Sequence, residues 1–244
     1  LHCADSQRTN RWRLNQQAQI GTEHLQATGE SFGESMDPQG RIILEFPYAC
    51  DLIEHLEFDT IYHEHVFYFT LTALGPLFAR HSLEIVGVER LGIHGGSLRL
   101  FAAHQGAGKI DSSVEQLLET ERQLGVDSPD FYASFAGNVE KLKVELMTLL
   151  TRLKREGSTL AAYGASAKGS TLLNYYGIGT ELLDFVVDRS TYKQGRFTPG
   201  MHLPIMPPEE LVSRQPDYAL LLTWNFAEEI LRQQSEYLNR GGRF

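Results

Sequence analysis

The chain has 244 residues, a formal net charge of −9, 42% hydrophobic residues and two cysteines. These values are typical of a globular protein of one or two domains, without a disulfide framework or zinc motif, and the lack of Lys/Arg clusters argues against nucleic acid or an anionic membrane as a partner. No apolar run reaches the roughly 18 residues of a membrane-spanning helix and no signal-peptide core follows Leu1, so we expect a cytoplasmic protein without a membrane partner.

The first block of predicted elements covers residues 36–110. The pattern predicts a strand at 41–46, helices at 49–56 and 70–81, and strands at 83–91 and 97–104. Three glycines between Gly92 and Gly96 suit an antiparallel connection between the last two strands. This order matches the closing part of a class I methyltransferase sheet, an α/β fold whose earlier strands we expect to be missing. Residues 1–35 have no helical or strand period and stay unassigned; a non-native segment is one interpretation of them.

Residues 111–157 are predicted to be a helical connector. Its second helix has an apolar stripe at spacings of three and four, formed by Phe135, Val139, Leu142, Leu146, Leu149, Leu150 and Leu153. We interpret the connector as an amphipathic hairpin that joins two domains.

The second block covers residues 158–244. Strands are predicted at 159–163, 182–188 and 218–223, and helices at 170–176 and 226–238. Strands that alternate with helices indicate a parallel, doubly wound sheet, so we expect a truncated Rossmann-like domain.

The segment 58–68, FDTIYHEHVFY, places Asp59, Tyr62, His63, Glu64 and His65 among apolar and aromatic residues. Burying such groups without partners would be unfavourable, so they either pair with one another or do chemistry. If the segment is extended, Tyr62 shares a face with Glu64, and His63 shares the other with His65. A metal site would lack an obvious third ligand, a structural cluster remains an alternative, and we favour acid–base catalysis because histidine titrates near neutrality.

Three further segments are candidate binding sites. The loop GASAKG at 164–169 suits a phosphate or diphosphate, because a Gly-rich turn that opens a helix presents backbone N–H groups. The loop at 188–204 follows the second strand of its block, at the edge where open α/β sheets bind ligands. The turn HGGS at 94–97 allows close backbone approach. The candidate contacts are Gly164, Ser166, Lys168, Asp188, Lys193, Arg196, Gly95, Gly96, Ser97 and Arg99; a tight turn or a solvated loop without a ligand is the alternative for each segment.

Six motifs in one order identify a family. EFPY (45–48), EFDTIYHEHVFYF (57–69), HGGSLRLF (94–101), YGASAKGSTLLNY (163–175), VVDRSTYKQGRFTPGMHLPI (186–205) and TWNF (223–226) resemble the C-terminal two-thirds of S-adenosylmethionine-dependent sugar C-methyltransferases. These enzymes methylate nucleotide-linked 4-keto-deoxysugars. The resemblance covers residues 36–244 and implies an N-terminal zinc domain and a Gly-rich S-adenosylmethionine loop, both of which we expect to be absent from this chain.

The resemblance also implies roles for individual residues. His65 would be the base that removes the proton next to the ketone, and Tyr62 and Glu64 would stabilise the resulting enediolate. His63 and the candidate contacts above would bind the nucleotide-diphosphate sugar. We expect the fragment to be inactive alone. The alternative is a nucleotide or nucleotide-sugar binding module, or an NAD-linked oxidoreductase, although the full dinucleotide fingerprint is missing.

Overall fold

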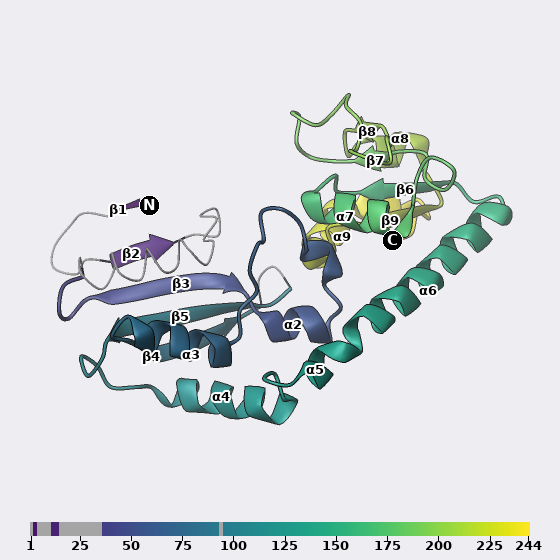
Figure 1. Ribbon diagram of the computed structural model, residues 1–244. Coiled ribbons are helices and arrows are strands. Elements are labelled where there is room, and N and C mark those ends of the chain that lie inside the picture. The colour runs from purple at the N-terminus through teal and green to yellow at the C-terminus, as the bar shows by residue number, and fades with distance from the viewer. Residues whose placement is uncertain (1, 4–10, 15–35, 93–94) are drawn as a thin grey trace. The chain divides into compact units, whose positions relative to one another are not determined.

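The structure is a computed structural model that describes residues 2–3, 11–14, 36–92 and 95–244. The chain divides into two compact units (Figure 1). Unit 1 comprises residues 1–57 and 63–136, and unit 2 comprises residues 58–62 and 137–244. Among the described residues, no helix is long and apolar enough to cross a lipid bilayer.

Unit 1 is built on a five-stranded sheet. Its strands are β1 (His2–Cys3), β2 (Arg11–Leu14), β3 (Arg41–Pro47), β4 (Leu83–Leu91) and β5 (Ser97–His104), in the order β1-β2-β3-β5-β4. Strand β2 is parallel to β3, whereas β5 is antiparallel to both β3 and β4. The antiparallel pairing predicted for the last two strands is confirmed, and β5 lies between β3 and β4 as in the closing part of a class I methyltransferase sheet.

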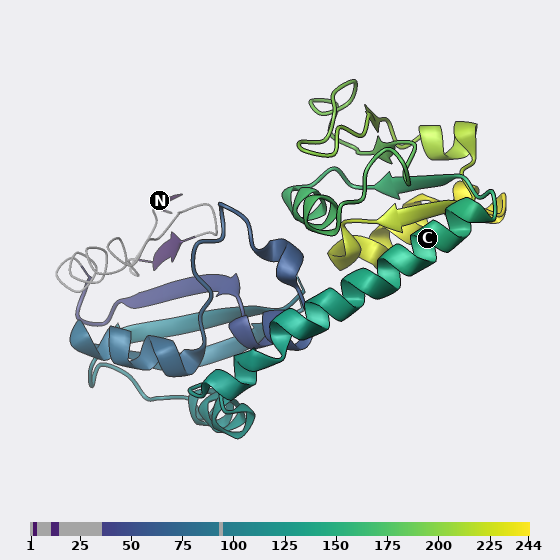
Figure 2. The ribbon, with the colours of Figure 1, turned by 45° about the vertical axis from the view of Figure 1, so that its right-hand side comes forward.

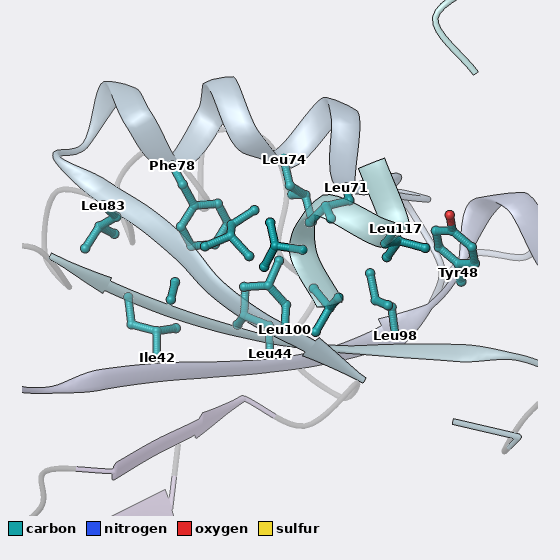
Figure 3. Close-up of a cluster of buried hydrophobic side chains, with 14 of the residues drawn as sticks. Ile42, Leu44, Tyr48, Leu71, Leu74, Phe78, Leu83, Leu98, Leu100 and Leu117 are labelled. Carbon is teal, nitrogen blue, oxygen red and sulfur yellow. The ribbon is translucent and has the colours of Figure 1, made fainter. Parts of the chain in front are cut away.

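The core of unit 1 lies between this sheet and the helix α3 (Leu71–Arg80). Figure 3 shows Leu71, Leu74 and Phe78 of α3 pointing toward the strand residues Leu98 and Leu100. Both strand residues are fully buried. The predicted N-cap is confirmed, because the Thr70 hydroxyl accepts a hydrogen bond from the Ala73 N–H at 3.1 Å. Thus the helical spacing of apolar residues at 70–81 corresponds to the face that packs on the sheet.

The remaining helices of unit 1 are short or peripheral. Helix α2 (Ala49–Glu54) follows β3 directly, α4 (Ser112–Leu124) packs against α3 and β4, and α5 (Pro129–Ala133) follows α4. Cys50 on α2 is buried in the core, as a small apolar side chain would be.

Unit 2 is built on a four-stranded parallel sheet. Its strands β6 (Leu160–Tyr163), β7 (Val186–Val187), β8 (Ile205–Met206) and β9 (Tyr218–Leu221) have the order β8-β7-β6-β9. All three pairings are parallel, so the prediction of a parallel doubly wound sheet is confirmed. Figure 2 shows this sheet from a second side.

The strand order of unit 2 reverses between β6 and β9. The chain runs outward from β6 to β7 and β8, and then returns to place β9 on the other side of β6. In open α/β sheets such a switch point leaves a crevice at the carboxyl ends of the two strands. The residues that follow β6 and β9 therefore belong to one end of the sheet.

Several predicted bounds in unit 2 are wrong. Helix α7 (Ala167–Tyr176) begins three residues before the predicted start, so Lys168 lies in its first turn rather than in a loop. The predicted strand at 182–188 shrinks to two residues, because only Val186 and Val187 pair with β6. The helix predicted at 226–238 consists of η2 (Trp224–Phe226), α9 (Ala227–Gln233) and α10 (Ser235–Asn239), and α8 (Glu210–Arg214) was not predicted.

The boundary between the units falls inside the predicted connector, because α4 and α5 belong to unit 1 and most of α6 (Phe135–Arg155) to unit 2. The predicted stripe of α6 is only partly buried: Val139, Leu150 and Leu153 are covered, whereas Leu142 and Leu149 are 38% and 42% exposed.

Candidate functional site

The segment from Phe58 to His65 is not extended. Residues Phe58–Thr60 form a single 3-10 turn (η1), and His63 and Glu64 form a turn further along. An extended strand would place Tyr62 and Glu64 on one face and His63 and His65 on the other, and this arrangement therefore does not occur. The side chains of His63 and Glu64 are 80% and 63% exposed, and His63 Nε2 lies 4.0 Å from Glu64 Oε1.

Asp59 is the buried acid of this segment, with 2% of its surface exposed. Its Oδ2 accepts a hydrogen bond from the indole Nε1–H of Trp224 at 2.7 Å. Burial raises the pKa of the Asp59 carboxyl, while the hydrogen bond from Trp224 and the charge of Lys168 oppose that shift. Sequence reasoning named Asp59 and the TWNF motif but gave neither a role; their joint presence among the family motifs was the available signal.

His65 is partly buried and belongs to unit 1. Its imidazole ring stacks on the phenol ring of Tyr68, with 6.5 Å between centroids and 28° between planes. Tyr62 is also partly buried and belongs to unit 2. A half-covered imidazole retains access to a ligand.

The turn before β5 lies over a buried carboxylate. Gly96 has φ +146°, and a Cβ there would collide with the side chain of Asp51. Asp51 is 2% exposed and forms an ion pair with Arg90 at 2.5 Å. Ser97 is fully buried, whereas Gly95 is half-buried. His94 lies outside the described residues.

Arg99 lies in the middle of a row of cross-strand pairs. Its Nε and Nη2 donate to Glu45 Oε2 at 3.0 and 2.9 Å, and its Nη1 donates to Glu89 Oε2 at 2.9 Å. These three residues are register partners on β3, β5 and β4. The hydrogen bonds to both carboxylates raise the pKa of Arg99. Its guanidinium is engaged within the sheet, and a ligand contact stays a prediction.

The GASAKG loop lies at the switch point of unit 2. Gly164 has φ +97°, and a Cβ there would lie 2.5 Å from Thr223 Cγ2, so only glycine fits between β6 and the end of β9. The Ser166 hydroxyl caps α7 by accepting from the Gly169 N–H at 3.0 Å. The loop therefore has a structural explanation and also places a helix N-terminus at the switch-point end of the sheet.

Lys168 points its ammonium to the aromatic ring of Trp224, with Nζ 4.6 Å from the ring centroid. The Nζ atom is itself buried. This cation–π contact places the Lys168 charge beside the residue that holds Asp59.

Asp188 and Lys193 contact each other and the GASAKG loop. Asp188 Oδ2 accepts from the Ala165 N–H at 2.8 Å, and Lys193 Nζ donates to Asp188 Oδ2 at 3.2 Å and to the Ala165 carbonyl at 2.8 Å. Asp188 Oδ1 accepts from the Ser190 N–H at 2.8 Å. The two loops that sequence reasoning treated separately are thus joined, while Arg196 is exposed.

Within the described residues, no group of three or more His, Cys, Asp and Glu side chains could hold a metal ion. A shallow cavity of about 620 Å³ opens along α6, lined by Met147, Thr148, Thr151, Arg152, Arg155 and Glu156. None of these six is a predicted site residue.

Comparison with known proteins finds a family match and a relative. Residues 92–244 match the family model of the C-methyltransferase C-terminal domain. The chain is 39% identical over 208 residues to the C-methyltransferase NovU of Streptomyces niveus. That alignment covers 85% of this chain and 50% of NovU, so the chain spans about half the length of the relative.

Proposed function

Because the chain belongs to the C-methyltransferase family, we propose that it takes part in the C-methylation of a nucleotide-linked 4-keto-deoxysugar. The main support is the segment EFDTIYHEHVFYF at 57–69, which places one half-covered imidazole close in sequence to a phenol and a carboxylate. The similarity to NovU extends over most of the chain.

The proposed reaction begins with removal of a proton. His65, as a neutral imidazole, takes the proton from the carbon next to the ketone, and the electrons of that C–H bond move onto the ketone oxygen. Tyr62 and Glu64 stabilise the enediolate, whose oxygen accepts a hydrogen bond from the Tyr62 hydroxyl. The carbon of the enediolate is then the nucleophile that accepts a methyl group.

S-adenosylmethionine supplies an electrophilic methyl group in this family. In the described part of unit 1, the glycines of the Gly92–Gly96 connection join two antiparallel strands, and the turn from β3 into α2 has no glycine. These residues do not fit the Gly-rich turn between a parallel strand and a helix that such a cofactor needs. We therefore assign no contact with the methyl donor to the described residues of unit 1.

We further propose that unit 2 binds the nucleotide diphosphate. Support comes from the reversal of strand order between β6 and β9, with Gly164 and the N-terminus of α7 at that end of the sheet. Ser166 and the backbone N–H groups would donate to phosphate oxygens, and Arg196 would supply a countercharge. His63, Gly95, Gly96, Ser97, Arg99, Asp188 and Lys193 remain predicted substrate contacts.

The test is methyl transfer from labelled S-adenosylmethionine to a nucleotide-linked 4-keto-deoxysugar, measured on the full-length protein. His65→Ala should abolish turnover and leave nucleotide-sugar affinity close to that of the unchanged protein. His81→Gln, which changes another histidine of unit 1 at the C-cap of α3, is the control. Retained turnover in His65→Ala would exclude this histidine as the base.

Calorimetry separates the proposal from its alternatives. Binding of a nucleoside diphosphate or its sugar by this chain is the expected result. Binding of NAD alone would favour an oxidoreductase, and binding of the nucleotide sugar without turnover in the full-length protein would favour a binding module.

A further inference from the structure

Residues Phe58–Tyr62 form part of unit 2, although the chain on both sides of them belongs to unit 1. The turn η1 lies against α7, and its three residues are nearly covered: Phe58, Asp59 and Thr60 are 8%, 2% and 2% exposed. The turn Phe58–Thr60 is therefore an integral piece of the fold of unit 2 rather than a loop on its surface.

Two kinds of contact hold this segment. The Phe58 ring stacks on Tyr176 of α7, with centroids 5.0 Å apart and 25° between planes. The Asp59 carboxylate accepts from the Trp224 indole at 2.7 Å, and Lys168 contacts the same indole through its ammonium. Trp224 follows β9 and Lys168 opens α7, so both anchoring residues lie at the switch-point end of the sheet.

Backbone hydrogen bonds connect the buried turn Phe58–Thr60 to Tyr62. The Ile61 N–H donates to the Phe58 carbonyl at 3.0 Å, and the Tyr62 N–H donates to the Thr60 carbonyl at 3.0 Å. A single 3-10 turn is too short to be stable by itself, so its position depends on the side chains that fix it. A displacement of Asp59 would therefore move the Tyr62 backbone with it.

We propose that Trp224 and Lys168 are positioning residues for the reaction, which act through Asp59 to fix the place of Tyr62. The proposal rests on the proposed function only in giving Tyr62 a role at the substrate. Catalysis depends on such placement, because a displacement of about 1 Å can lower a rate by about a hundredfold. Lys168 then acts through the indole and Asp59 rather than as a diphosphate countercharge.

Hydrogen exchange of this chain tests the anchor without any need for activity. Trp224→Phe keeps most of the ring and removes the donor, and we expect about tenfold faster exchange in peptides covering 58–62, the effect of losing one hydrogen bond to a charged group. Amides of β6 should keep their protection. The matched control is Arg240→Gln, which removes an exposed ion pair of unit 2. Unchanged exchange at 58–62 in a folded Trp224→Phe protein overturns the proposal.

A second variant covers the case in which Trp224→Phe does not fold. Lys168→Met removes the ammonium and keeps the apolar stem, and it should also accelerate exchange at 58–62. Unchanged exchange at 58–62 in Lys168→Met overturns the role of Lys168.

Kinetics on the full-length protein distinguish positioning from binding. Lys168→Met should lower kcat by about tenfold with a KM near that of the unchanged protein, because the ground-state contacts with the nucleotide sugar remain. A raised KM with unchanged kcat would instead make Lys168 a substrate contact. Turnover that survives in His65→Ala would contradict the proposed function and leave the exchange result intact.

Discussion

Tyr48 donates its hydroxyl proton to Glu121 Oε1 at 2.8 Å in the interior of unit 1, across 73 positions of the chain. The same carboxylate accepts from the Leu71 N–H at 2.7 Å and from the Thr72 N–H at 2.6 Å. Glu121 is fully buried and thus satisfies the free N–H groups at the start of α3 from a different helix, α4. Burial, with hydrogen bonds to Cys50 and Glu121, raises the pKa of the Tyr48 phenol, which stays a donor.

Glu121→Ala should destabilise unit 1 by about 3–5 kcal/mol, because it leaves several buried donors without an acceptor. Glu121→Gln should cost less, since one oxygen still accepts. Urea denaturation measures both. The control is Glu119→Gln on the same helix, which breaks an exposed pair with Arg122 and should change stability little. Equal stability for Glu121→Ala and Glu119→Gln would contradict this account of α3.

The glycines before β5 should differ sharply in their tolerance of alanine. Gly96→Ala would drive a methyl group into the buried Asp51 side chain at a positive φ, and we expect a loss of about 2–4 kcal/mol from overpacking and backbone strain. A Cβ at Gly92 meets nothing within 4 Å, so Gly92→Ala serves as the control. Thermal unfolding measures both variants. A tolerated Gly96→Ala would mean that Asp51 is free to move.

The apolar periods predicted the architecture because burial of one face determines where helices and strands pack. The spacing of Leu71, Leu74 and Phe78 predicted helix α3, and the glycines after Leu91 predicted the antiparallel pairing of β4 with β5. The predicted limits of helices and strands were wrong where a side chain caps or ends an element. Ser166 caps α7, which begins at Ala167, three residues before the predicted start at Ser170. The strand predicted at 182–188 pairs with β6 only at Val186 and Val187.

The partners within the candidate site were beyond prediction because they are distant in sequence. Asp59 and Trp224 are 165 positions apart, and nothing in either local pattern indicates the other. Asp188 and Lys193 are close in sequence and could be expected to pair. The hydrogen bond from Ala165 to Asp188, however, depends on the contact between the 164–169 loop and the 188–204 loop. The presence of titratable residues at 59–65 was informative, whereas which of them is buried depended on tertiary structure.

Lys193→Met should lower the stability of unit 2 by about 1 kcal/mol, a modest value because the Lys193 side chain is 42% exposed. The substitution removes the donor that joins Asp188 to the Ala165 carbonyl. Hydrogen exchange should therefore accelerate at residues 164–166 and 188–194. The control is Arg189→Gln, which breaks an exposed pair with Glu229. A loss of nucleotide affinity in Lys193→Met without faster exchange would instead indicate direct ligand contact.

Asp59 should make the stability of unit 2 depend on pH. Its pKa is raised above the ordinary 3.8 by burial, so the folded state binds the proton more tightly than the unfolded state does. Stability contributed by this group is therefore present at low pH and decreases as pH rises from about 3.8 through the raised pKa. Asp59→Asn removes this pH-dependent contribution to the stability of unit 2.

The free energy of unfolding of the unchanged protein, minus that of Asp59→Asn, should thus fall as the pH rises from about 4. Urea denaturation followed by the fluorescence of Trp224 measures it, in a Trp12→Phe background that leaves one tryptophan. Other titrating groups cancel in the difference. A constant difference as the pH rises would show that the pKa of Asp59 is not raised, and a rising difference would show that the opposing interactions with Trp224 and Lys168 outweigh burial.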